Sequence, residues 1–237
     1  MIALARFMLR SYTRRHTYFA PLAATLIAMF ILYSYKPNPV MDSYSVTSVF
    51  LFLGAAWMGR TFLNHVSPQQ EQLHVTQIGS MKKYLLSQMM ALFVPIVLFT
   101  VLFILFPIVT KMFVRPVHAD ELWLAAFGHL VMGMLGAALS LFFQTALMPN
   151  GARATAMLLI VVIVSIGAKS ITAHLPSPLA WLRWLLPPVS SLMDGLLNTG
   201  TTVSPHEVWG MVGYGLAYTL ALVLVYMYVS VRRDART

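Results

Sequence analysis

Long stretches without charge constrain this sequence more than any other feature. From Tyr84 to Thr110 the chain has no Asp, Glu, Lys or Arg and consists mainly of Leu, Phe, Val and Ile. The hydrocarbon core of a bilayer is crossed by roughly 20 helical residues. Hydrophobic residues make up 59% of the 237-residue chain and charged residues only 10%, whereas soluble domains are about 25% charged. We therefore predict an all-α integral membrane protein.

Six apolar segments are long enough to be interpreted as transmembrane helices. In chain order they are about Tyr18 to Tyr35, Tyr44 to Leu63, Tyr84 to Thr110, Leu122 to Leu147, Ala154 to Ile171 and Val208 to Val231. Arg60 in the second segment and Lys169 in the fifth lie close enough to an end for their side chains to snorkel to the headgroups. Because six is an even number, both termini are predicted on the same side of the membrane.

The basic residues indicate which side that is. Eleven of the sixteen Lys and Arg residues fall on the side of the termini, and five fall on the other side. The eleven are Arg6, Arg10, Arg14, Arg15, Arg60, Lys82, Lys83, Arg153, Arg232, Arg233 and Arg236, and the five are Lys36, Lys111, Arg115, Lys169 and Arg183. Cytoplasmic segments carry the excess of basic residues. We therefore predict a multi-pass plasma-membrane protein with both termini in the cytoplasm, and we do not take the net charge of +9 as a sign of nucleic-acid binding.

Residues 1–16 predict an amphipathic helix at the membrane interface. Arg6, Arg10 and Arg14 are spaced at i, i+4 and i+8 and so form one basic stripe on an otherwise apolar helix. Such a helix anchors the chain at the membrane surface, docks a partner, or does both.

The longest cytoplasmic connection, residues 64–83, predicts a short helix. Ser67 is a suitable N-cap, Pro68 suits the first helical position, Glu71 lies in the first turn, and Gly79 is a suitable C-terminal stop. Two interpretations remain open here, namely a docking helix that lies along the membrane surface and an ordinary solvated loop.

A long external segment, residues 173–207, precedes the last span. Because four prolines divide it, we predict two short interfacial or re-entrant helices, Leu179 to Leu186 and about Ser190 to Leu197, which cap the outer leaflet. Trp181 and Trp184 in the first of them suit the headgroup layer.

The fourth predicted span carries a histidine and several small residues. His129 is interpreted as a neutral histidine bonded to a neighbouring helix, with a proton-relay or substrate role as the alternative. Small residues at helical spacing predict close helix packing, and the pairs are Ala55 with Gly59, Gly133 with Ala137, and Gly136 with Ser140.

Sequence motifs for catalysis, metal binding and nucleotide binding are missing. The chain has no cysteine, which excludes disulfides, thiolate catalysis and cysteine metal sites. Its histidines do not have the spacing of a metal site, and it has no Gly-Lys dipeptide and hence no phosphate-binding loop of the GxxxxGK[ST] type. A membrane enzyme would need convergent polar groups, but the nearest candidates, His65, Glu71 and His74, do not share a helix face. We predict that the chain is not an enzyme and holds no metal or cofactor.

The order of these features resembles the permease subunit of a type-two ABC exporter, a six-span class found in bacterial drug, peptide and polymer efflux systems. The resemblance covers nearly the whole chain, 1–237, as one transmembrane permease domain. It rests on the basic N-terminal helix MIALARFMLRSYTRRH, the loop between spans two and three, and the broken external hairpin before span six. The most specific piece is EQLHVTQIGSMKKYLLSQMMALF, Glu71 to Phe93.

The resemblance implies that a separate cytoplasmic ABC ATPase dimer binds ATP and Mg, and that a second permease subunit, identical or related, completes the transport path. It implies a coupling helix at Gln69 to Ile78 and an elbow lined by Arg6, Arg10 and Arg14. The implied coupling residues are Gln69, Gln70, Glu71, Gln72, Leu73, Thr76, Ile78, Lys82 and Lys83, and the residues suggested for the substrate path are Ser34, Thr47, Ser48, Ser165 and Ser170.

A path lined mostly by Leu, Val, Ile, Met and Phe favours an amphipathic or hydrophobic cargo, such as a peptide, a drug or a lipid-like molecule, moved outward by alternating access. The alternative hypothesis is a non-transporting membrane interaction, assembly or sensory protein built on the same scaffold. An associated ATPase distinguishes the two.

Overall fold

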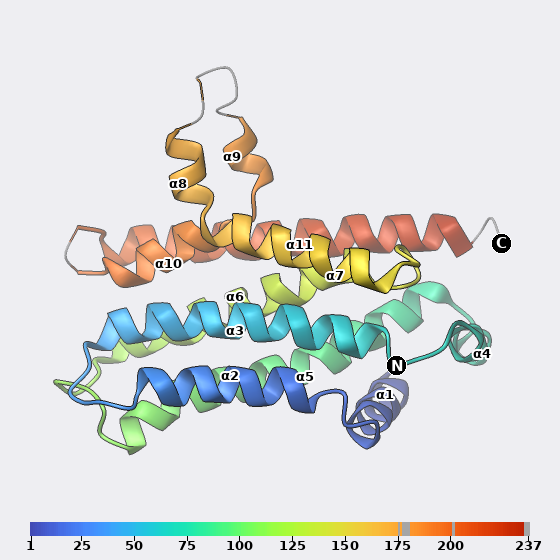
Figure 1. Ribbon diagram of the computed structural model, residues 1–237, viewed down its shortest axis with the longest axis horizontal. Helices are drawn as coiled ribbons and strands as arrows, with labels where there is room; N and C mark the ends of the chain where they lie inside the picture. Colours follow the sequence, from blue (N-terminus) through green and yellow to red (C-terminus); the bar gives the residue numbers. More distant parts are fainter. Residues whose placement is uncertain (175, 177–180, 201, 235–237) are drawn as a thin grey trace.

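The computed structural model describes residues 1–174, 176, 181–200 and 202–234, and every regular element in these ranges is helical. The elements are α1 (Ile2–Arg14), α2 (Phe19–Leu32), α3 (Val40–Leu63), α4 (Pro68–Ile78), α5 (Met81–Val109), α6 (Ala119–Ser140), the 3-10 turn η1 (Leu141–Phe143), α7 (Gly151–Ile166), α8 (Ala168–Ala173), α9 (Leu182–Leu185), α10 (Val189–Leu197) and α11 (Pro205–Asp234). Figure 1 shows the long helices running along one common axis, with α1 and α4 across the end where both termini lie.

Four helices are long and apolar enough to cross a membrane. They are α3, α5, α6 together with η1, and α11. Helices α1 and α2 meet at 81° and pass the same test only as a bent pair, which would be a fifth span. Helix α7 is apolar but has only 16 residues. The all-helical prediction is confirmed for the described residues, and the structure supplies four to five of the six predicted spans.

The fourth and fifth predicted segments end earlier than expected. The fourth stops at Phe143 instead of Leu147 because Gln144 turns to an extended conformation, and its amide donates to the Tyr226 hydroxyl at 2.6 Å. The fifth stops at Ile166, before Gly167, and a separate helix α8 follows. Lys169 does not simply reach for the headgroups, because its ammonium pairs with Asp194 of α10 at 2.7 Å.

The external segment also differs from the prediction. Helix α10 matches the predicted second helix to within one residue, but of the predicted helix Leu179 to Leu186 only α9 is described as helical, and residues 177–180 lie outside the described ranges. Helices α8 and α9 stand out sideways from the bundle instead of capping its end (Figure 1). Tyr218 of α11 donates to the Leu185 carbonyl at 2.6 Å and so ties the base of this projection to the bundle.

The centre of the bundle is the contact between α3 and α6. A Cβ on Gly136 would lie 2.3 Å from the Phe52 carbonyl oxygen, and one on Gly59 would lie 2.2 Å from the Ser140 hydroxyl. The predicted close packing is therefore confirmed at Gly136, where only a residue without a side chain fits, whereas at Gly59 an added Cβ would require the Ser140 side chain to turn away.

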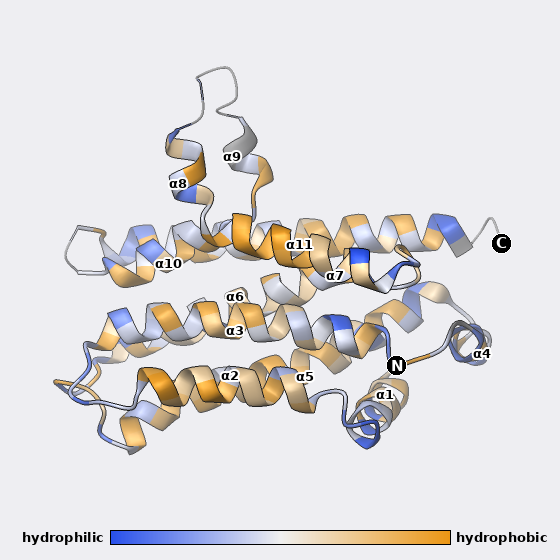
Figure 2. Cartoon of the chain, in the orientation of Figure 1, coloured by the Kyte–Doolittle hydropathy of each residue, from blue (hydrophilic) through white to orange (hydrophobic). Residues whose placement is uncertain are grey.

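Charge is concentrated at one end of the molecule. Figure 2 shows hydrophilic residues gathered at α1, α4, the start of α7 and the end of α11, with mostly apolar residues along the bundle. At the opposite end, Arg115 forms two bonds of 2.9 and 2.5 Å with Glu121, which also accepts from the His118 backbone at 3.1 Å. The acidic start of α6 is thus a capped helix end that is neutralised by an arginine.

Gly136→Ala tests the importance of the α3–α6 contact. Because the added methyl group would meet backbone atoms that cannot rotate away, we expect a loss of about 1–3 kcal/mol, the usual cost of overpacking, seen as a lower thermal unfolding midpoint in detergent. Gly210→Ala in α11 is the control, since nothing lies within 4 Å of the position that its Cβ would occupy and alanine favours helix. Equal midpoints for the two variants would contradict the assignment.

Candidate functional site

Helix α4 is defined at both ends by local chemistry. The Ser67 hydroxyl accepts from the Gln70 backbone at 3.3 Å, and the Gln70 side chain accepts from the Ser67 backbone at 3.3 Å, which forms a capping box. At the other end, Gly79 has a left-handed conformation with φ of 71°, which glycine adopts without steric cost. The predicted helix is confirmed as Pro68–Ile78, and for these residues the alternative of an ordinary loop is wrong.

Helix α4 presents one face to the bundle and the other outward. Val75 and Ile78 pack against the main hydrophobic cluster, and the His74 ring lies 5.4 Å from the Phe7 ring of α1. On the outer face Leu73 is 61% exposed. Of the implied coupling residues, the exposed ones are Gln69, Gln70, Gln72, Leu73, Thr76, Lys82 and Lys83, whereas Glu71 and Ile78 are partly buried.

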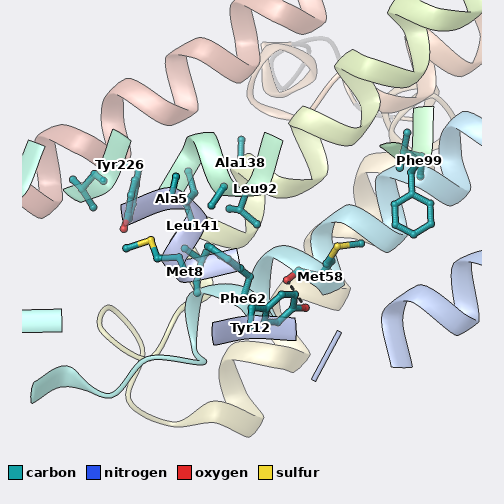
Figure 3. Close-up of a cluster of buried hydrophobic side chains, with 14 of the residues drawn as sticks. Ala5, Met8, Tyr12, Met58, Phe62, Leu92, Phe99, Ala138, Leu141 and Tyr226 are labelled. Carbon is teal, nitrogen blue, oxygen red and sulfur yellow. Dashed lines mark hydrogen bonds between the residues drawn. The ribbon is translucent and has the colours of Figure 1, made fainter. Parts of the chain in front are cut away.

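Helix α1 packs part of its apolar surface on the bundle, while Ile2 and Phe7 stay exposed. Ala5, Met8 and Tyr12 are buried in the cluster shown in Figure 3. The Tyr12 hydroxyl lies 2.6 Å from the Thr61 hydroxyl, and its ring lies 5.2 Å from the Phe62 ring. The predicted stripe of Arg6, Arg10 and Arg14 is on the opposite, exposed face. Helices α1 and α4 together form a terminal platform, which we define as residues 2–14 and 68–78.

His65 lies in the connection between α3 and α4, next to Tyr12 of the terminal platform. Its Nδ1 bonds to the Phe62 carbonyl, its ring lies 5.6 Å from Tyr12, and its Nε2 is buried without a partner in the described structure. Burial lowers the pKa of His65 below the usual 6.5. The backbone bond works against that shift, while the positive charges of Arg15 and His74 add to it. His65 is therefore a packing residue held in its neutral form, and the described residues contain no group of three metal-binding side chains.

A cavity of about 550 Å³ separates α4 from the end of α11. Its walls include Glu71, Val75, Gln144, Tyr226 and Arg233, which come from three different parts of the chain. The inner face of α4 is therefore only partly supported, which leaves room for the helix to move relative to α11.

The five residues suggested for a substrate path are not brought together within one chain. Thr47 and Ser48 are buried between helices, Ser165 is buried on α7, and Ser34 and Ser170 are exposed. Ser48 and Ser165 donate to carbonyls of their own helices at 2.7 and 2.6 Å. They line none of three pockets, which lie between α4 and α11, between α8 and α11, and between α5 and α6.

His129 has the environment predicted for it. Its Nδ1 lies 2.7 Å from the Ala125 carbonyl, which can only accept, so Nδ1 carries the hydrogen. Its Nε2 lies 2.9 Å from the Thr47 hydroxyl of α3. The side chain is fully buried and joins α6 to α3.

Three residues at this end of the molecule were not identified from the sequence as contact residues. Tyr12 joins α1 to α3, Arg60 bonds to Gly151 at the start of α7, and Asn64 bonds to Thr145 between η1 and α7. The sequence marked Arg60 as a cation near the end of a span, but it could not indicate its partners, because these lie more than eighty positions away in the sequence.

The lowered pKa of His65 predicts a pH effect on stability. The folded protein disfavours the imidazolium form of His65. The contribution of neutral His65 to the free energy of unfolding is therefore complete above the unfolded pKa of about 6.5, and it is lost as the pH falls through the lower folded pKa. His65→Phe keeps an aromatic ring against Tyr12 but cannot be protonated. We expect its unfolding midpoint in detergent to fall less than that of the wild type on acidification below about pH 6.5. Parallel plots of unfolding midpoint against pH for the two proteins would show that His65 has the same pKa in the folded and the unfolded protein.

No protein-family model matches this chain, and no curated protein or solved structure matches it.

Proposed function

We propose that this chain is the membrane-spanning subunit of an ATP-driven ABC exporter of the type-two class. In this proposal a separate cytoplasmic ATPase dimer hydrolyses ATP with Mg, and a second permease subunit, identical or related, completes the path. The cargo is amphipathic or hydrophobic and leaves the cytoplasm by alternating access. The protein lies in the plasma membrane with both termini in the cytoplasm.

The observation that carries the proposal is the terminal platform. Helix α4 is a short, capped helix outside the bundle, and it presents Leu73, 61% exposed, among polar neighbours. An exposed leucine on a rigid, otherwise polar surface suits a protein contact, because binding is concentrated in a few anchor side chains. The chain has no phosphate-binding loop of its own, so the contact partner supplies ATP hydrolysis.

The distribution of charge supports the orientation. Eleven basic and two acidic residues, Glu71 and Asp234, belong to the end that carries the platform and the termini. Basic and acidic residues are equal in number in the rest of the chain, so this end accounts for the whole net charge of +9. The positive-inside rule then places the platform in the cytoplasm, where ATP is available.

The six-span topology is part of the proposal. Helix α2 is the first span, and its 14 residues cover about 21 Å, with flanking residues completing the crossing. The fifth crossing combines α7 with α10, which follow one another beside α11 (Figure 1). Helices α8 and α9 connect these two helices and project sideways from the crossing. The path residues Ser34 and Ser170 are exposed in the single chain, which suits a path formed between two subunits.

Purification of the tagged protein from its own cells in mild detergent tests the function. We expect a stoichiometric ATPase with measurable ATP hydrolysis, and we expect Leu73→Asp to reduce the bound ATPase about tenfold, as for the loss of an interface anchor. Ile78 is left unchanged because it is partly buried against the bundle.

Val114→Asp is the matched control for Leu73→Asp. Val114 is 64% exposed in the loop between α5 and α6, at the end of the bundle opposite the platform, so its change should leave the ATPase bound. A wild-type protein that purifies without any ATPase would exclude the exporter and favour the interaction, assembly or sensory protein.

A further inference from the structure

The last turn of α3 carries an arginine that is bonded entirely to another part of the chain. Arg60 donates through Nε to the Thr155 hydroxyl at 3.0 Å and through one terminal nitrogen to the Gly151 carbonyl at 2.7 Å. Its other terminal nitrogen donates to the Phe143 carbonyl. The planar guanidinium therefore holds both the end of η1 and the first turn of α7, a geometry that lysine cannot reproduce.

Asn64, one helical turn after Arg60, binds the same segment. Its Oδ1 accepts from the Thr145 backbone at 2.7 Å and from the Thr145 hydroxyl at 2.9 Å. Its Nδ2 donates to the Arg60 carbonyl at 2.9 Å. Because residues at i and i+4 share a helix face, the two side chains form one polar contact, which we call the α3–α7 latch and define as Arg60 and Asn64 with their partners in residues 143–155.

Helix α7 has little other support. Only Ala154, Leu158, Val162 and Ser165 of its 16 residues are buried. Ile160 and Ile163 on its outer side are 59% and 66% exposed. The latch is thus the polar attachment of the inner end of α7 to the central helix pair.

The same turn of α3 also leads to the terminal platform. The adjacent residue Thr61 bonds to Tyr12 of α1 at 2.6 Å, and the chain enters α4 only a few residues after Asn64. Residues 64–67 therefore connect α4 directly to the turn of α3 that holds α7. The cavity beside α4 leaves space for a displacement of that helix.

We propose that Arg60 and Asn64 are positioning residues that make the inner ends of α3 and α7 move as one body, so that a displacement of α4 by its partner reaches α7. The transmission of movement rests on the proposed function, whereas the rigid connection does not. The sequence without cysteine allows both parts to be measured with introduced cysteines.

The rigid connection is tested on the purified chain alone in lipid nanodiscs. Trp57→Cys on α3 and Ile160→Cys on α7, both at exposed positions, carry spin labels, and electron resonance reports the distance between them. We expect one narrow distribution in the otherwise unchanged chain and a clearly broader one after Arg60→Gln. Arg153→Gln, which alters an exposed arginine in the first turn of α7, should leave it narrow. Equal widths for Arg60→Gln and Arg153→Gln would overturn the latch even if no ATPase is ever found.

The transmission of movement is tested in the complex with its ATPase. We expect Arg60→Gln to keep the ATPase bound but to lower the stimulation of ATP hydrolysis by the permease about tenfold, within the range for loss of a coupling contact. Asn64→Cys with Thr145→Cys, introduced into the Arg60→Gln chain, replaces the lost bonds by a disulfide. Oxidation should then restore stimulation and reduction should abolish it, a reversal that a purely structural role would not give. Normal stimulation in reduced Arg60→Gln complexes would exclude transmission through the latch.

Discussion

The approach of Gly136 to the Phe52 carbonyl, and of Gly59 to Ser140, sets the distance between α3 and α6. Every other long helix is placed by contact with one or both of these two. Hydrophobic burial does not favour helix association inside lipid, because the lipid tails are equally apolar. Close packing of small residues and hydrogen bonds between helices must therefore hold the bundle together, and α3 provides both.

The polar residues of α3 connect it in turn to its neighbours. Ser45 donates to the Met193 carbonyl of α10 at 2.8 Å, and Tyr44 donates to the Ile104 carbonyl of α5 at 3.2 Å. Thr47 meets His129 of α6 at 2.9 Å. These side chains are buried, where an unbonded polar group would be costly. Of the residues suggested from the sequence for a transport path, Thr47 makes one of these contacts between helices, whereas Ser48 bonds within α3.

The proposed mechanism depends on a contrast between this centre and its periphery. Helices α3 and α6 form a closely packed pair, whereas α4 lies beside a cavity and α7 buries only four of its 16 residues. A partner that moves α4 would act on the last turn of α3, where Tyr12 and Arg60 bind from two other elements. Closely packed helices transmit displacement instead of absorbing it, and loosely supported helices are free to follow. The arrangement therefore suits a permease driven from one end.

The sequence by itself determined the helical class, the apolar segments, the capped helix α4 and the concentration of basic charge at one end. These features depend on local signals, such as run length, Ser67 and Gly79 as helix caps, and the spacing of small residues. The tertiary structure decided that Gln144 bonds to Tyr226, that Lys169 pairs with Asp194, and that Arg60 holds α7 instead of reaching for headgroups. The physical reason is that each of these outcomes depends on a partner distant in the sequence. The residues alone specify that a buried polar group needs a partner, but they do not specify which partner it finds.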